Sequence, residues 1–152
     1  MSECETPPAP QPEPQEAFPA GPAVGPAAAA APDPAHLATG KKGEDIACRH
    51  LWKRGFRVLA RNYKGRQGEI DIIAEMRNRL HFVEVKTRTS DSLGPAEERV
   101  DQKKRDLIRE TARMYLDQFR DKPEGGYQFD VVSVYLDREG RPEREEWIPN
   151  AF

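Results

Sequence analysis

The first 40 residues contain no lysine or arginine and a single aromatic residue, Phe18. The same stretch holds ten of the chain's 14 prolines, together with 11 alanines and five acidic residues. A segment of this composition cannot bury enough apolar surface to offset the entropy lost on ordering. We therefore expect residues 1–40 to form a disordered, Pro/Ala-rich acidic tail and residues 41–152 to form one folded domain.

Cysteine and long apolar runs are also scarce. The two cysteines, Cys4 and Cys48, are too few for a disulfide framework, which favours a reducing compartment. No apolar run approaches the roughly 20 residues needed to span a bilayer. The acidic tail has neither the basic and apolar regions of a secretory signal nor the arginines of a transit peptide. These absences predict a cytoplasmic protein that does not enter the membrane.

The charge of the chain is nearly balanced. The formal net charge is −2, but without the five acids of the tail, 24 basic residues face 21 acidic ones, leaving the domain near +3. A committed DNA-binding domain usually carries a stronger basic footprint. The charge therefore permits contact with nucleic acid and favours a transient or structure-selective contact.

Hydrophobic periodicity predicts a mixed α/β domain. One helix is expected over residues 43–54, where Gly55 stops it, and a long helix over 96–120. Strands are expected over residues 56–61, 69–74, 80–88 and 127–136, with a short edge strand over 146–148. The resulting α-β-β-β-α-β order places a mixed central sheet between flanking helices.

Two acidic residues are predicted to face each other across a hairpin. A two-residue turn at 77–78 sets the register so that Asp71 stands opposite Glu84, with Cβ atoms about 4.5–5.5 Å apart. Like charges so placed are destabilising, so a divalent cation or the neighbouring Lys86 should offset them. The apolar face of the same strand is then formed by Ile70, Ile72 and Ala74.

Two helical residues also carry charge where folding favours apolar side chains. At 100° per residue, Glu44 lies about 20° from Leu51, along the apolar stripe of the first helix. Lys104 lies within the stripe that Val100 and Leu107 begin in the long helix. Violations of the hydrophobic pattern that cluster are typical of a functional site.

Each of these charges also has a structural interpretation. Glu84 and Lys86 share a strand face and could form an ordinary salt bridge. Glu44 stands in the first turn of its predicted helix, where the helix dipole favours an acid. Lys104 could extend its ammonium group past the core into solvent. The residues alone leave both interpretations open.

Several segments carry a resemblance to known families. A helical Glu44, a strand Asp71 and the Glu-x-Lys of Glu84 and Lys86 resemble the PD-(D/E)xK nuclease superfamily, although Ile70 replaces the proline of its name. Five blocks are similar to the YraN family, a bacterial family predicted to be endonuclease-like and distantly similar to archaeal Holliday-junction resolvases. They are GEDIA (43–47), RNY (61–63), GEIDIIA (68–74), FVEVKTR (82–88) and PNAF (149–152).

This resemblance implies a restriction-endonuclease-like fold, DNA as the ligand and Mg²⁺ or Mn²⁺ as the cofactor. It implies catalytic roles for Glu44, Asp71, Glu84 and Lys86, the three acids being the metal ligands. Lys104 and Arg88 are candidates for contacts with DNA phosphates, which position the DNA without reading its sequence.

The expected function is therefore metal-assisted hydrolysis of DNA phosphodiester bonds, with branched or structured DNA as a candidate substrate. By analogy with structure-selective resolvases, the enzyme could act as a homodimer. Two alternatives remain open. One is a nucleic-acid-binding module on the same fold that performs no catalysis, and the other is a structural protein with a fortuitous salt-bridge ladder.

Overall fold

The computed structural model describes residues 34–89, 100–118 and 123–152. Their secondary structure has the expected α-β-β-β-α-β order followed by an edge strand, which confirms the α/β class. The predictions made for residues 1–33 lie outside this part of the chain. The elements are α1 (Pro34–Lys53), β1 (Arg57–Lys64), β2 (Glu69–Met76), β3 (Arg79–Thr89), α2 (Gln102–Leu116), β4 (Tyr127–Leu136) and β5 (Pro142–Ile148).

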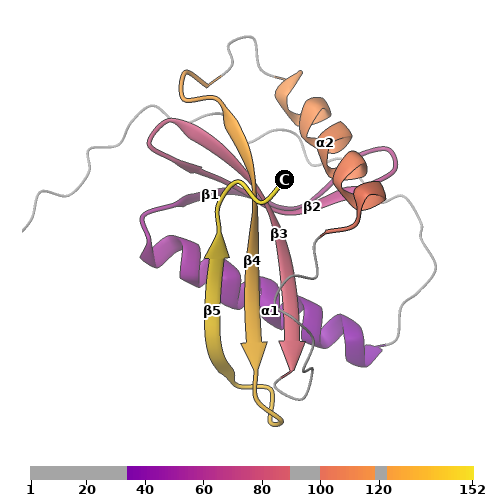
Figure 1. Ribbon diagram of the computed structural model, residues 1–152, viewed down its shortest axis with the longest axis vertical. Coiled ribbons are helices and arrows are strands. Elements are labelled where there is room, and N and C mark those ends of the chain that lie inside the picture. The colour runs from indigo at the N-terminus through magenta and orange to yellow at the C-terminus, as the bar shows by residue number, and fades with distance from the viewer. Residues whose placement is uncertain (1–33, 90–99, 119–122) are drawn as a thin grey trace, which may run out of the picture.

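The five strands form one mixed sheet in the order β1-β2-β3-β4-β5. Strands β3 and β4 run parallel, and the other neighbours are antiparallel. In Figure 1, α1 crosses behind β3, β4 and β5, while α2 lies nearer β2. One apolar cluster packs beneath each helix: Phe82 and Ile73 lie in the α2 cluster, and Val83 and Ile72 in the α1 cluster. The core is therefore two layers, one on each face of the sheet.

Helix α1 ends where glycine was expected to stop it. Gly55 has a left-handed φ of +88°, its N–H donates to the Trp52 carbonyl, and the next N–H, of Phe56, donates to the Leu51 carbonyl. This pair of hydrogen bonds is the Schellman cap, for which glycine is the favoured residue. The helix begins at Pro34, earlier than the predicted Gly43, since proline is tolerated in a first turn whose N–H groups have no helical partner.

Helix α2 begins later than predicted. Asp101 is its N-cap, with extended backbone angles and a side chain that accepts a hydrogen bond from the Lys104 N–H at 2.9 Å. Val100 and Asp101 therefore precede the helix instead of lying within it, while Val100 still packs into the core. Residues 96–99 and 119–120, at the two ends of the predicted helix, lie outside the described residues.

The β2–β3 hairpin has the predicted two-residue turn. Arg77 and Asn78 occupy it with φ values of +50° and +61°, and Met76 pairs with Arg79. Positive φ at both turn residues is typical of the type I′ turn, whose twist matches that of the strands. Asparagine is common in this conformation, whereas arginine is unusual. No helix among the described residues is long and apolar enough to cross a membrane.

Candidate functional site

A cavity of about 290 Å³ opens between α1, the start of β2, the middle of β3 and the first turn of α2. It brings together four of the six residues that were predicted from the sequence to be functional. They are Glu44 from α1, Asp71 from β2, Glu84 from β3 and Lys104 from α2. The other two, Lys86 and Arg88, are half-buried on β3 and are not among the described residues that line the cavity.

The cavity forms where β2 and β3 stop pairing. The predicted register holds from Met76–Arg79 to Ile72–Val83, but the ladder does not continue to Asp71 and Glu84. The Asp71 carboxylate instead accepts a hydrogen bond from the Val85 backbone N–H at 2.7 Å. The Asp71 side chain thus accepts the hydrogen bond that a backbone carbonyl would accept in a continuous ladder. The carboxylates of Asp71 and Glu84 line the cavity.

The predicted alternation along β2 also breaks beside Asp71. Ile70 packs with Ile73 in the α2 cluster, whereas Ile72 packs in the α1 cluster. The expectation that Ile70 and Ile72 share one face is therefore wrong. Strict alternation requires a continuous ladder, and pairing with β3 begins only at Ile72. This irregularity is what exposes Asp71 to the cavity.

The Asp71 carboxyl group lies in an environment that disfavours its charge. Burial, followed by the nearby charge of Glu84, raises its pKa to about 7, although the Val85 N–H and the Lys104 ammonium act in the opposite direction. An aspartate whose pKa is moved to neutrality by burial and a like charge is a candidate functional group. Near pH 7 the metal-free protein therefore holds Asp71 partly protonated.

Glu84 and Lys104 form an ion pair at the cavity. Glu84 is 4% exposed, and the Lys104 ammonium donates to its Oε1 atom. Burial lowers the pKa of Lys104, but the hydrogen bond to Glu84 and its charge outweigh burial and raise that pKa. The sequence pointed to Lys86 as the lysine that offsets the paired acids. The structure places Lys104, from the first turn of α2, against Glu84.

One oxygen of Glu84 has no hydrogen-bond partner in the part of the chain that the structure describes. Its Oε2 atom is buried and unsatisfied within the described part of the chain. A buried acceptor without a partner is rare and costs free energy, about 1–3 kcal/mol and more for a charged group. Such an atom, in a cavity that it shares with the half-buried Asp71 carboxylate, marks a place suited to a cation.

Glu44 reaches the cavity because β1 holds it there. The Asn62 side-chain amide donates to Glu44 Oε2 at 2.7 Å, and an Arg61 nitrogen lies 3.7 Å from the same oxygen. Asn62 itself has a left-handed φ of +48°. Sequence reasoning assigned no role to Asn62, and the signal that could have found it was its place in the RNY block at 61–63.

A close contact between α1 and β3 brings the helix near the sheet beside Glu44. Gly43 packs against Thr87 so tightly that a Cβ atom on Gly43 would lie 1.8 Å from the Thr87 hydroxyl oxygen. No side chain larger than a hydrogen fits this crossing point. The helix can therefore approach β3 and present Glu44 only because residue 43 is glycine.

Replacing Gly43 by alanine is expected to force α1 away from β3 and to destabilise the protein by about 1–3 kcal/mol, as overpacking does. Chemical denaturation measures the loss. The matched control is Gly40→Ala in the same helix, because a Cβ at Gly40 meets no atom within 4 Å. Alanine there should be neutral or stabilising by up to about 1 kcal/mol. Equal stability of the two variants would contradict this account of the crossing.

The acids of the cavity do not form a ready metal centre by themselves. Within the described ranges, no three His, Cys, Asp or Glu side chains converge closely enough to hold an ion. Glu44 therefore does not complete a three-ligand cluster with Asp71 and Glu84. The site is a pair of strand carboxylates with a lysine on one of them and a third acid at the rim.

The fold and cavity together define an α/β protein with a mixed five-stranded sheet and a carboxylate–lysine site where two central strands part. The chain belongs to the family described as Uncharacterised protein family UPF0102, whose model matches residues 43–134. This is the YraN family, so the resemblance seen in the sequence is confirmed.

Curated relatives match the chain over most of its length. A UPF0102 protein of Pelotomaculum thermopropionicum is 41% identical over 113 residues, which cover 74% of this chain and 93% of the relative. A UPF0102 protein of Solibacter usitatus is 44% identical over 115 residues, covering 74% and 84%. One from Dictyoglomus thermophilum is 41% identical over 113 residues, covering 74% and 95%.

Proposed function

We propose that this protein is a Mg²⁺- or Mn²⁺-dependent endonuclease that hydrolyses DNA phosphodiester bonds, with branched or structured DNA as the candidate substrate. The observation that carries the proposal concerns the Oε2 atom of Glu84, which is buried in the cavity that also holds Asp71 and has no hydrogen-bond partner among the described residues. Three carboxylates, of Glu44, Asp71 and Glu84, line this cavity, and the Lys104 ammonium contacts only one of the Glu84 oxygens. The charge balance favours a further cation.

The donor atoms of the cavity fit a hard divalent cation. Asp71 and Glu84 supply carboxylate oxygens, and Mg²⁺ commonly uses one or two carboxylates while keeping several waters. Glu44 would then contact the ion through a water molecule, because it does not converge with Asp71 and Glu84 into a three-ligand cluster. When bound, such an ion polarises a phosphate oxygen and lowers the pKa of a coordinated water.

Side chains of this protein would stabilise the scissile phosphate, orient the attacking water and position the DNA. Lys104, whose ammonium lies beside Glu84, would stabilise negative charge on the oxygens of the scissile phosphate. Lys86, two residues beyond Glu84 on the same strand, would orient the attacking water or accept its proton. Arg88 would contact a neighbouring phosphate and hold the DNA backbone in place. Asn62 keeps Glu44 at the rim through its 2.7 Å hydrogen bond.

Cleavage of plasmid, flap and four-way-junction DNA tests the proposal. EDTA-treated protein should regain activity with Mg²⁺ or Mn²⁺, and Glu84→Gln should lower that activity by about 100-fold or more. Glu143→Gln is the matched control, because Glu143 is an exposed residue of β5. Lack of cleavage of every substrate with either metal would contradict the enzyme, as would equal activity of the two variants.

A second candidate function is a nucleic-acid-binding module that does not cleave. The ion pair between Lys104 and Glu84 favours it, because an ammonium already neutralises part of the acidic site. This module would bind DNA in a salt-dependent manner that Glu84→Gln leaves unchanged. Its melting temperature would not respond to Mn²⁺, whereas an enzyme that binds the ion should be stabilised by it.

A further inference from the structure

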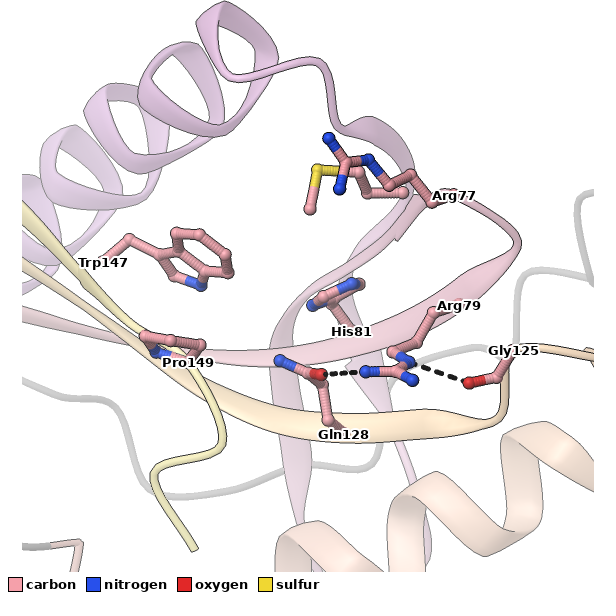
Figure 2. A pocket seen from close by; sticks show the side chains of 8 residues that line it. Arg77, Arg79, His81, Gly125, Gln128, Trp147 and Pro149 are labelled. Atoms are coloured by element: carbon pink, nitrogen blue, oxygen red, sulfur yellow. Dashed lines mark hydrogen bonds between the residues drawn. The ribbon is translucent and has the colours of Figure 1, made fainter.

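A second cavity, of about 390 Å³, lies at the other end of β3, beside the β2–β3 hairpin. Figure 2 shows it between the hairpin, the beginning of β4 and the end of β5. Its polar lining includes Arg77, Arg79, His81 and Gln128, and Trp147 closes one side. None of these residues belongs to the site described above.

One buried carboxylate organises this lining. Asp130, with 0% exposure, accepts hydrogen bonds from His81 Nδ1 at 2.7 Å, Gln128 Nε2 at 2.7 Å and Trp147 Nε1 at 3.0 Å. It also accepts one from the Asn150 backbone N–H at 2.9 Å. Three lining side chains are therefore held in fixed orientations by a single anchor. Such pre-organisation is what a binding site requires.

The same network extends to Arg79. Its guanidinium donates to the Gly125 carbonyl at 2.8 Å and to the Gln128 side-chain oxygen at 3.1 Å, as the dashed lines in Figure 2 show. An arginine carries five N–H donors, so these bonds orient the group and leave further donors for a ligand. Arg79 is thus an exposed but positioned cation in the lining of the cavity.

Arg77 is the second cation, and the turn does not explain its presence. It stands at a turn position with φ of +50°, where asparagine or glycine would fold with less strain. Figure 2 shows its guanidinium on the side of the cavity across from Arg79. An arginine in a backbone conformation that disfavours it points to a use for its charge.

Charge and shape together select the ligand. Two guanidinium groups line the cavity, and no carboxylate does so among the described residues. A phosphate monoester carries about −1.5 to −2 charges at pH 7, which matches this pair. Met76 and Trp147 supply an apolar wall, and the volume falls in the range of about 300–1,000 Å³ that is usual for small-molecule sites.

We propose that this cavity binds a nucleoside monophosphate group. Arg77 and Arg79 hold the phosphate, while Met76 and Trp147 contact the base. A free nucleotide and the phosphorylated end of a DNA strand present the same chemistry. The proposal does not depend on nuclease activity, because it uses no residue of the Asp71–Glu84 cavity.

Tryptophan fluorescence tests it directly. The chain has two tryptophans, and Trp52 is 72% exposed, so Trp52→Phe leaves Trp147 as the only reporter with little effect on folding. Deoxyadenosine monophosphate should give a saturable change in emission, and deoxyadenosine should bind at least about tenfold more weakly. Equal affinity for the two, or no saturable change with the monophosphate, would overturn the proposal.

Arg77→Asn separates binding from folding. Asparagine suits the left-handed turn, so the variant should melt at the same or a higher temperature, yet bind deoxyadenosine monophosphate about tenfold more weakly or worse. Arg141→Asn is the matched control, because Arg141 is exposed in the β4–β5 turn, away from the cavity. Equal affinities in these two variants would overturn the assignment.

Competition identifies the source of the ligand. Displacement of the mononucleotide by a 5′-phosphorylated oligonucleotide, but not by its 5′-hydroxyl form, would support the site and assign it to strand ends. Displacement by neither would support it as a site for free nucleotides. Equal displacement by both would show that the phosphate monoester is not recognised and would overturn the proposal.

Discussion

Replacing Asp71 by asparagine is expected to lower metal-dependent DNA cleavage by about 1,000-fold, while making the metal-free protein more stable at pH 8. Asparagine has nearly the same shape and can still accept the hydrogen bond that the Val85 N–H donates to Asp71. It cannot carry the negative charge that would hold a divalent cation. In Asp71→Asn, DNA cleavage should therefore fall while the stability of the metal-free protein at pH 8 rises.

The stability effect follows from the pKa of Asp71. Burial and the charge of Glu84 raise it to about 7, above the value of about 3.9 in an unfolded chain. The native state therefore keeps a proton that the unfolded state releases, and the free energy of unfolding falls as pH rises from about 4 to about 7. Asp71→Asn removes this fall, which is on the order of a few kcal/mol.

Thermal or denaturant unfolding at pH 5 and pH 8, with and without Mn²⁺, measures the effect. Mn²⁺ should stabilise the wild type at pH 8 and leave Asp71→Asn unchanged. Asp106→Asn, at an exposed position of α2, serves as the control. Wild-type cleavage in Asp71→Asn would refute the catalytic role, and a variant less stable than wild type at pH 8 would refute the electrostatic argument.

Replacing Asp130 by alanine is expected to destabilise the protein by about 3–5 kcal/mol. The carboxylate is fully buried and accepts hydrogen bonds from three side chains and the Asn150 backbone. Alanine leaves these four donors without their acceptor and opens a void. The segment after β5 should be loosened, because the Asn150 N–H loses its bond to β4 while the 2.8 Å hydrogen bond from the Ala151 N–H to the Phe129 carbonyl remains.

The pH dependence of this variant provides a second measurement. Burial raises the pKa of Asp130, but the hydrogen bonds from His81, Asn150, Gln128 and Trp147 together lower it below its ordinary value. The stability that its charge contributes is therefore present above about pH 4 and is lost on further acidification. Asp130→Ala should lose less stability than wild type over that acidic range.

Urea unfolding of Asp130→Ala should show the loss against Asp106→Ala, an exposed helical position where alanine is tolerated. A loss below about 1 kcal/mol would mean that the buried network contributes little, since removal of one well-made hydrogen bond already costs that much. The second cavity should lose its affinity for a mononucleotide in the same variant, because His81, Gln128 and Trp147 lose their anchor.

Local structure was largely predictable from the sequence. Strand β4 has the predicted bounds, Gly55 caps α1 and the hairpin turns at residues 77–78. Each depends on neighbours in sequence: alternating apolar residues, the freedom of glycine at positive φ, or the turn preference of asparagine. The start of α2 was missed because an N-cap depends on backbone angles at Asp101, which periodicity does not report.

The candidate site was predictable only in part. Its carboxylates were identified because charges stood where apolar residues were expected, and the structure places Glu44, Asp71, Glu84 and Lys104 around one cavity. The partner of Glu84 was not identified, because Lys104 approaches it from a helix 20 positions away along the chain. Asn62, which holds Glu44 in place, gave no periodic signal at all.

The amino-acid sequence by itself determined the order of the elements and the acids that break the hydrophobic pattern, because these depend on periodicity and local turns. Its motif blocks carried the resemblance to the family. Only the tertiary structure decided where β2 and β3 part, which lysine meets Glu84 and how Asp130 organises a second cavity. These features depend on contacts between segments distant in sequence, whose geometry is set by how both helices pack on the sheet. The Gly43–Thr87 crossing is the clearest case, since a single missing Cβ sets the approach of α1 to β3.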